Sequence, residues 1–171
     1  MKEMRSLCFL QLQEDSVMAV RVQTEDFDVG LEMLALRQKN PKVGAVASFV
    51  GVVRDLNNGD DVSALTLEHY PGMTERSLED IVSEARDRWD IYDALIIHRV
   101  GTLLPLDQIV LVLVTSAHRG ESFKACEFLM DYLKTRAPFW KKEQTSSGDR
   151  WVEARESDTS AAMRWENTRD D

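Results

Sequence analysis

Hydrophobic and polar residues alternate with two different periods along the chain, which predicts a mixture of strands and helices. Residues 17–23 (VMAVRVQ) alternate as in a strand, and residues 28–38 repeat apolar positions as in a helix that Asp28 can cap. The valine-rich segment 43–54 (VGAVASFVGVVR) is typical of a buried strand, in which Gly51 indicates a bulge or a close backbone approach. The chain therefore opens with a strand, a helix and a second strand.

Turn residues separate the elements that follow. The segment DLNNGDD is a turn signal, so the strand predicted at 62–70 is expected to pair with the preceding strand as a hairpin. A helix is predicted at 74–89, with Thr74 as its cap and apolar positions three and four residues apart. Two further strands are predicted at 92–100 and 108–116, joined by a loop that carries Leu103, Leu104 and Pro105.

The last third of the chain is predicted to contain a helix, a hairpin and a closing helix. The first helix runs from about 120 to 136, because Pro138 disfavours helical geometry in the residue before it. Residues 139–145 and 150–155 form a hairpin around SSGD, and a short helix follows. Hairpins with helices between them indicate an α+β fold.

The chain is expected to form a single domain, because no linker or internal repeat divides it. This domain is expected at residues 18–158. Residues 1–17 precede the first clear strand and are interpreted as a dispensable, disordered extension, and residues 159–171 as an acidic C-terminal tail.

Charge and composition exclude several classes of function. The net charge of −9 argues against nucleic-acid binding, which requires a basic surface. No apolar run approaches the roughly 20 residues of a membrane span, and the amino terminus is no convincing signal peptide, so no membrane partner and a cytoplasmic location are expected. Motifs such as HExxH, the P-loop and GxGxxG are absent, so neither a bound metal nor a cofactor is expected. Cys126 lies at helical spacing with apolar residues and is interpreted as a core residue.

The segment 134–143 (KTRAPFWKKE) concentrates cations in this acidic chain. On strand geometry Lys141 and Glu143 share one face, and Lys142 lies on the other. If the turn folds back tightly, Lys134 and Lys141 converge on one pocket, where repulsion between two ammonium groups favours a neutral amine that can act as a base or nucleophile. A solvated basic turn is the alternative interpretation.

Two further positions are candidates for anion binding. His118 and Arg119 follow an apolar strand at the start of a helix, where backbone N–H groups attract anions. Arg54 ends another apolar strand, and its guanidinium suits phosphate or carboxylate. The alternatives are an exposed helix-capping segment in the first case and, in the second, a rim arginine paired with Asp55, Asp60 or Asp61.

Six stretches of the sequence resemble the catalytic subunit family of molybdopterin synthase, in the family's order. They are FVGVVR (49–54), ALTLEHYPGMTE (64–75), RDRWDIYDALIIHRVG (86–101), VTSAHR (114–119), MDYLKTRAPFWKKE (130–143) and GDRWVEAR (148–155). The resemblance extends over roughly residues 43–155, and DYLKTRAPFWKKE together with LEHYPGMTE makes it specific. It implies an α/β hammerhead-type fold.

The resemblance also implies partners and an activity. The catalytic subunits would form a homodimer within a heterotetramer, and each would bind one small ubiquitin-like sulfur-carrier subunit. The carrier's Gly-Gly tail would end in a thiocarboxylate, whose sulfur is transferred to cyclic pyranopterin monophosphate to build the dithiolene of molybdopterin. Such a donor brings its own sulfur, which agrees with a core role for Cys126.

The resemblance assigns roles to particular residues. Lys134 and Lys141 match the family's essential lysines, with Lys134 taking part in sulfur transfer and Lys141 acting as acid/base partner oriented by Glu143. The other implied substrate-binding residues are Val52, Val53, Arg54, His118, Arg119, Lys142 and, as a further candidate, Arg155. A non-catalytic module that binds a phosphorylated metabolite or a peptide tail is the alternative.

Overall fold

Two β-sheets and four helices make up the part of the chain that the computed structural model describes, residues 19–57, 60–152 and 156–166. The first sheet has the order β1 (Val20–Gln23), β5 (Ile91–Arg99), β7 (Gln108–Ser116) and β2 (Ala45–Val52). The second has the order β3 (Leu56–Asn57), β4 (Asp60–His69), β8 (Phe139–Thr145) and β9 (Gly148–Val152), with β6 (Gly101–Leu103) also pairing with β4. The helices are α2 (Val29–Gln38), α3 (Met73–Arg88), α4 (Arg119–Arg136) and α5 (Glu156–Glu166). The predicted α+β class is confirmed.

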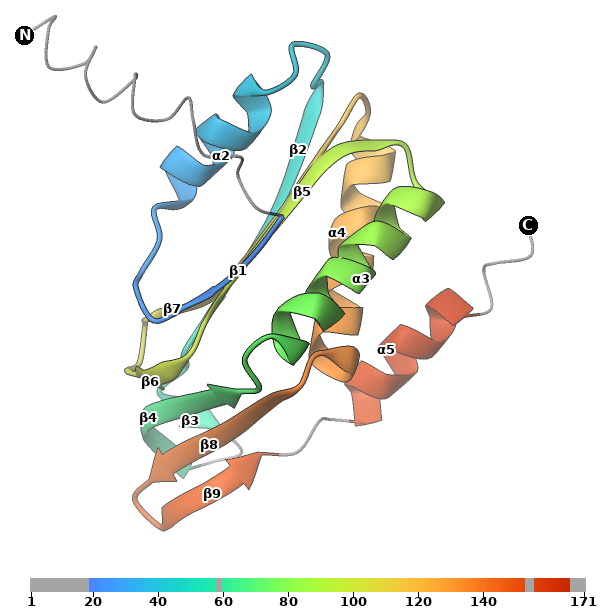
Figure 1. Cartoon of the computed structure of the whole chain (residues 1–171). Coiled ribbons are helices and arrows are strands. Elements are labelled where there is room, and N and C mark those ends of the chain that lie inside the picture. Colours follow the sequence, from blue (N-terminus) through green and yellow to red (C-terminus); the bar gives the residue numbers. More distant parts are fainter. Residues whose placement is uncertain (1–18, 58–59, 153–155, 167–171) are drawn as a thin grey trace, which may run out of the picture.

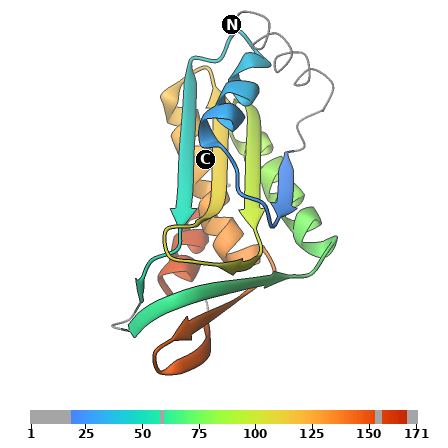
Figure 2. The same cartoon turned by 90° about the vertical axis from the view of Figure 1, so that its left-hand side faces the viewer.

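Helices cover both faces of the first sheet. Helix α2 lies on one face, α3 and α4 lie on the other, and the second sheet crosses one end (Figures 1 and 2). Strands β5 and β7 occupy the centre, so alternate residues face different helices: Leu95 and Ile97 pack on the α2 side, and Ala94 and Ile96 on the α3 and α4 side. Central strands buried on both faces read as continuous apolar runs, which is why the sequence predicted them well.

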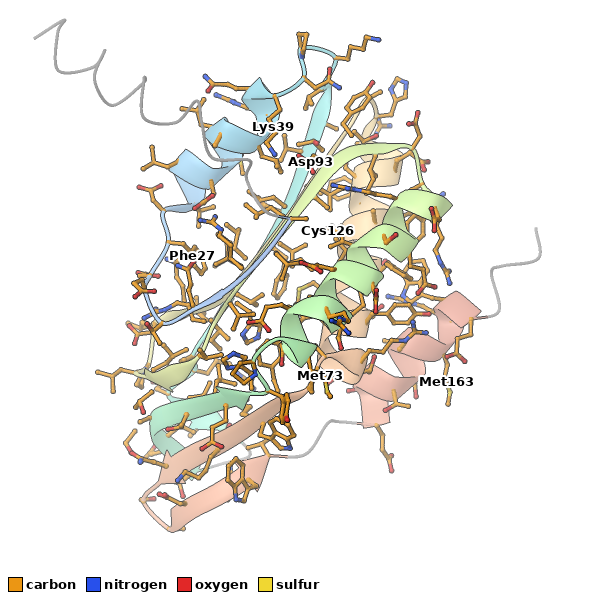
Figure 3. All side chains as sticks on the ribbon, in the orientation of Figure 1. Phe27, Lys39, Met73, Asp93, Cys126 and Met163 are labelled. Carbon is orange, nitrogen blue, oxygen red and sulfur yellow. The ribbon has the colours of Figure 1, made fainter. Side chains whose placement is uncertain are left out.

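The side chains confirm the interpretation of Cys126. Phe27 belongs to the cluster under α2, whereas Cys126 lies in the larger cluster under α3 and α4 (Figure 3). Burial raises the pKa of the Cys126 thiol to about 11, and the charge of Glu127 adds to this shift. A thiol held protonated is a poor nucleophile, so Cys126 is a packing residue.

Strand β2 differs from the prediction in two ways. Among the described strands it pairs with β7 alone, at the edge of the sheet. Phe49 and Val52 are 40% and 47% exposed, so the expected burial of this strand is wrong. The expected hairpin with the strand at 62–70 is also wrong, because that strand, β4, lies in the second sheet and pairs with β3, β6 and β8. The pairing with β7 has a bulge between Gly51 and Val52, and Val52 beyond it still pairs with Gln108.

Gly51 lies at a bulge and a close contact, as predicted. A Cβ at this position would lie 2.8 Å from Cγ1 of Val110, so glycine leaves room for the Val110 side chain of the neighbouring strand, and the predicted bulge lies directly after it. Helix α2 also begins as predicted, with Oδ1 of Asp28 accepting a hydrogen bond from the Leu31 amide at 3.0 Å.

Thr74 does not cap the helix predicted at 74–89. Helix α3 begins after Gly72, whose φ of 81° suits glycine, and the Gly72 amide donates to Oε2 of Glu75 at 2.7 Å. The Thr74 hydroxyl instead accepts from the Tyr70 amide and donates to the Pro138 carbonyl at 3.3 Å. Thr74 therefore ties the start of α3 to the turn that leads into β8.

The loop expected to carry Leu103, Leu104 and Pro105 contains a strand that the sequence did not reveal. β6 pairs with β4, with Leu103 opposite Leu65. The turn that follows is closed by a hydrogen bond from the Asp107 amide to the Leu104 carbonyl at 3.0 Å, and Leu106 adopts a φ of 75°. Three residues are too few for a recognisable period, and the partner strand is distant in sequence, so β6 escaped prediction.

The C-terminal hairpin and helix close the structure. The predicted hairpin is confirmed for β8 and β9, whereas residues 153–155 lie outside the described part. Helix α5 packs Ala162 and Trp165 into the core, so the expected boundary at 158 falls inside a helix. The predicted extension at 1–17 also lies outside the described residues. Among those that are described, no helix is both long and apolar enough to span a membrane.

A stacked ring pair joins the two sheets. The rings of His98 in β5 and Phe139 in β8 are 3.8 Å apart between centroids. Burial lowers the pKa of His98 to about 4; the hydrogen bond to the Arg99 carbonyl opposes this shift and the charge of His69 adds to it. His98 is therefore neutral at neutral pH.

This lowered pKa predicts a loss of stability in mild acid. Below pH 6.5 the unfolded chain binds a proton at His98, whereas the folded chain does not until about pH 4. The free energy of unfolding should therefore fall by about 3 kcal/mol over this range, in addition to contributions from other groups. Urea denaturation between pH 7 and 4 should show a shallower dependence for His98→Leu than for the wild type. Equal slopes for wild type and His98→Leu would contradict the prediction.

Candidate functional site

A polar pocket lies where the end of β2 meets the second sheet. It encloses about 280 Å³, part of which is open to solvent. The chain leaves β2 at Val52, and Val53 is held by hydrogen bonds with Leu106 and Asp107 of the β6–β7 turn. The pocket is lined by Val52, Val53, Arg54, Asn57, Val62, Leu65, Lys141 and Glu143.

Glu143 is the buried acid of this pocket, with a side chain that is 3% exposed. Its Oε1 accepts a hydrogen bond from Nδ2 of Asn57 at 2.7 Å and lies 3.4 Å from Nζ of Lys141. Its Oε2 accepts from both Nε and Nη2 of Arg150, at 3.2 and 3.1 Å. Both carboxylate oxygens therefore have donors, as a buried charge requires.

These contacts keep Glu143 ionised. Burial alone would raise the pKa of its carboxyl group, but the hydrogen bonds from Arg150 and Asn57 and the charge of Lys141 outweigh burial and lower the pKa below its usual value. The pocket thus holds a fixed negative charge between two cations, Lys141 and Arg150.

The strand geometry predicted for Lys141 and Lys142 is confirmed. Lys141 shares the inner face of β8 with Glu143. Lys142 lies on the outer face, where its Nζ is 3.3 Å from Asp149 and 5.9 Å from the ring centroid of Trp151. The two lysines are adjacent in sequence but meet different surroundings, so only Lys141 faces the pocket.

Arg54 lies at the pocket mouth and is exposed. Its Nη2 donates to Oδ1 of Asn57 at 3.4 Å, a long bond to a neutral group. Among the described residues that line the pocket, Arg54 and Lys141 are cations and Glu143 is the anion, and Arg150 adds a further cation beside Glu143. In a chain of net charge −9, this local excess of cations favours an anionic ligand.

The structure does not bring the other predicted residues to this pocket in one chain. Nζ of Lys134 lies 3.3 Å from Asp158 of α5, and the lysine side chain is half exposed. His118 and Arg119 are exposed at the first turn of α4, whereas Lys134 is in its last turn. The 18 residues of α4 separate these ends by roughly 27 Å. Arg155 lies outside the described residues.

Among the polar groups, sequence reasoning missed Asn57, which lines the pocket, and Arg150, which binds Glu143. Arg150 had a usable signal, because the predicted hairpin around SSGD places it directly opposite Glu143. Asn57 had none, since an asparagine in a turn segment is normally solvated. In the described ranges no three His, Cys, Asp or Glu side chains gather as ligands for a metal ion.

Comparisons with known proteins agree on one family. The family model described as MoaE protein matches residues 22–136. A relative from Ralstonia nicotianae, named molybdopterin synthase catalytic subunit, is 64% identical over 146 residues, which cover 85% of this chain and 83% of the relative.

Solved structures give the same result. The molybdopterin biosynthesis MoaE protein from Burkholderia ambifaria has a TM-score of 0.75 and 59% identity, over 86% of this chain and 97% of that one. A complex of subunits 1 and 2 of the molybdopterin-converting factor from Helicobacter pylori has a TM-score of 0.67, over 80% and 92% of the chains. At 19% identity, it shows the fold alone.

The lowered pKa of Glu143 predicts a stability difference that depends on pH. At pH 7 Glu143→Gln should lower the free energy of unfolding by about 1–3 kcal/mol, because the charge-assisted bonds from Arg150 are weakened. The carboxylate's contribution is complete above its unfolded pKa of 4.5 and is lost as the pH falls through the lower folded pKa.

Urea denaturation at pH 7 and at several values below 4.5 measures this difference. The gap between wild type and Glu143→Gln should narrow as the pH falls. The exposed residue Glu79 in α3 gives the matched control Glu79→Gln, which should have little effect at any pH. A gap that stays constant down to acid unfolding would show that the charge of Glu143 does not stabilise the fold.

Proposed function

The chain belongs to the MoaE protein family, and we propose that it is the catalytic subunit of molybdopterin synthase. In this role it transfers sulfur from the C-terminal thiocarboxylate of a small ubiquitin-like carrier subunit to cyclic pyranopterin monophosphate, which forms the dithiolene of molybdopterin. The names of its close relatives support this assignment. The cytoplasm is the proposed location of the reaction.

The observation that carries the proposal is the cationic pocket at the end of β2. Both reactants are anions: the pterin bears a phosphate and the carrier tail bears a thiocarboxylate. Arg54 and Lys141 line this pocket beside the buried Glu143, in a protein that is otherwise acidic. Fixed cations in a partly dry site stabilise negative charge that develops on reacting atoms.

The pocket residues suit the chemistry of sulfur transfer. The thiocarboxylate sulfur forms a bond to a side-chain carbon of the pterin while a carbon–oxygen bond of the pterin breaks. Lys141, 3.4 Å from Glu143, is placed to act as the acid/base group: its ammonium form gives a proton to the leaving oxygen, and its neutral amine takes a proton from the attacking water. Water then cleaves the acyl–sulfur bond, which leaves sulfur on the pterin and a carboxylate on the carrier. No cysteine nucleophile is needed.

Lys134 requires one change to take part. Its amine now pairs with Asp158, and the pair is partly exposed. A surface ion pair of this kind contributes about 0–1 kcal/mol, so exchange of Asp158 for an anionic substrate costs little. We therefore keep Lys134 as a proposed catalytic residue that turns to the thiocarboxylate when the carrier tail enters.

His118 and Arg119 are proposed to act in the site of a second copy of the chain. Of the roughly 280 Å³ of the single-chain pocket, much is open solvent, and the cavity itself holds only about 40 Å³, whereas most ligand sites hold roughly 300–1,000 Å³. Strand β2 is an exposed edge with apolar side chains, Phe49 and Val52, as expected at an interface.

A two-fold homodimer along this edge would pair the two β2 strands in opposite directions. The start of β2 is tied to the start of α4 by a hydrogen bond from the Gly44 amide to the Ser116 carbonyl at 3.1 Å. Opposite strand directions would therefore bring His118 and Arg119 of one copy to Val52–Arg54 of the other. Each active site would then contain residues of both copies.

The assignment of the lysines predicts a large difference between neighbours. Lys141→Ala should lower the rate of molybdopterin formation at least a hundredfold, as expected for loss of an acid/base group. Lys142→Ala should lower it far less, because Lys142 faces away from the pocket.

A reconstituted assay with thiocarboxylated carrier and precursor, with mass spectrometry of the pterin product, measures both rates. Precursor binding should change only modestly in Lys141→Ala. Equal loss of binding and turnover would instead favour a non-catalytic binding module.

The two-copy site predicts complementation between inactive variants. Arg119→Ala and Lys141→Ala should each be inactive alone. Mixed dimers would have one site with both defects and one intact site, so a randomly reassorted mixture should recover about a quarter of wild-type activity. If both residues served the site of their own chain, every site in the mixture would be defective and no activity would return.

A further inference from the structure

We infer that Arg150 is a positioning residue of the active site: it holds the buried Glu143 carboxylate so that the amine of Lys141 stays available for the reaction. The inference rests on the proposed function and assigns a role to a residue outside the set of substrate-binding positions. Arg150 lies in β9 directly opposite Glu143 in β8, so the hairpin register presents its guanidinium to the carboxylate.

The contacts divide the two oxygens of Glu143 between different donors. Arg150 occupies Oε2 with two N–H groups, at 3.2 and 3.1 Å, and its Nη2 also donates to the Asn57 carbonyl at 3.0 Å. Oε1 takes its short bond, 2.7 Å, from Asn57, whereas Lys141 lies farther away at 3.4 Å. Lys141 is therefore the most weakly held partner of the carboxylate.

This division matters because of the burial of Glu143. An ionised carboxylate that is 3% exposed needs a counter-ion. Arg150 supplies that charge through two bonds to one oxygen, and Asn57 supplies a neutral donor. Without Arg150, Lys141 would become the chief counter-ion and would be drawn into a tight ion pair, as an ammonium with no free lone pair.

The surface of the same hairpin shows why Lys141 and not Lys142 depends on Arg150. The Lys142 amine pairs with Asp149 on the outer face, away from Glu143. Its side chain lies within cation–π distance of Trp151. Lys142 therefore serves as an internal reporter of any general change in the hairpin.

The reactivity of the Lys141 amine tests the inference without any substrate. The purified full-length protein is treated briefly with trace acetic anhydride at pH 8, and acetylation of each lysine is measured by mass spectrometry. In Arg150→Met the acetylation rate of Lys141 should fall on the order of tenfold, because the reacting form is the neutral amine. Acetylation of Lys142 should not change.

A double variant shows whether Arg150 acts through Glu143. In Glu143→Gln there is no charge to capture Lys141, so adding Arg150→Met should have no further effect on Lys141 acetylation. Arg150→Lys keeps the charge but loses the paired N–H groups, so its effect should be intermediate. If Arg150→Met does not fold, as judged by its melting curve, Arg150→Lys carries the same comparison.

Turnover is measured on the same proteins. Arg150→Met should lower kcat with little change in KM for the pterin, since Arg150 reaches the substrate only through Glu143 and Lys141. The matched control is Arg86→Met, which removes an arginine paired with Asp93 outside the pocket and should leave both readouts unchanged.

The outcomes separate this inference from the proposed function. Unchanged Lys141 acetylation in Arg150→Met, or equal loss at Lys142, would overturn the positioning role. A fall in Lys141 acetylation without a fall in kcat would leave the contact standing and overturn the assignment of Lys141 as the acid/base group. The expected result is that Arg150→Met lowers both the acetylation rate of Lys141 and kcat. In the Glu143→Gln background, Arg150→Met should no longer change Lys141 acetylation.

Discussion

A buried carboxylate has to be compensated, and the compensation of Glu143 governs the arrangement of the pocket. Its donors come from three segments: Asn57 at the end of β3, Lys141 beside it in β8, and Arg150 across the hairpin in β9. Each segment is therefore held to the others by a charge that cannot be left unpaired. The same interactions that fix the second sheet thus place a lysine and a cationic rim at the end of β2.

This arrangement explains why the junction of the two sheets is both the structural centre and the proposed site of the reaction. The stack of His98 on Phe139 joins β5 to the first residue of β8, and Thr74 ties the start of α3 to Pro138 just before it. Strand β8 begins at this anchored point, which determines the face of the sheet to which each of its side chains points. Lys141 and Glu143 then face inward because they lie two and four residues beyond Phe139.

How far the sequence reveals this structure depends on the range of the interactions involved. Periodicity predicted β5, β7 and α4, because apolar residues recur along the whole length of each element. It also predicted the inward face of Lys141, which needs only local alternation. It placed the strand β2 but not its exposure at a sheet edge, and it missed β6, whose pairing with β4 is distant in sequence. Partner choice between strands is a long-range property that no local pattern encodes.

The position of His118 and Arg119 is also a long-range property that the local sequence does not reveal. Resemblance assigned them to the same site as Lys134 and Lys141, whereas they lie at the opposite end of α4 from Lys134. A rigid helix cannot bend to unite its own termini, so the two groups can serve one ligand only if different copies of the chain supply them. An edge strand with exposed apolar side chains, lying beside both groups at its two ends, provides the geometry for that exchange. On the proposed function, dimerisation is then a condition of the chemistry, because each chain alone would hold two incomplete halves of a site.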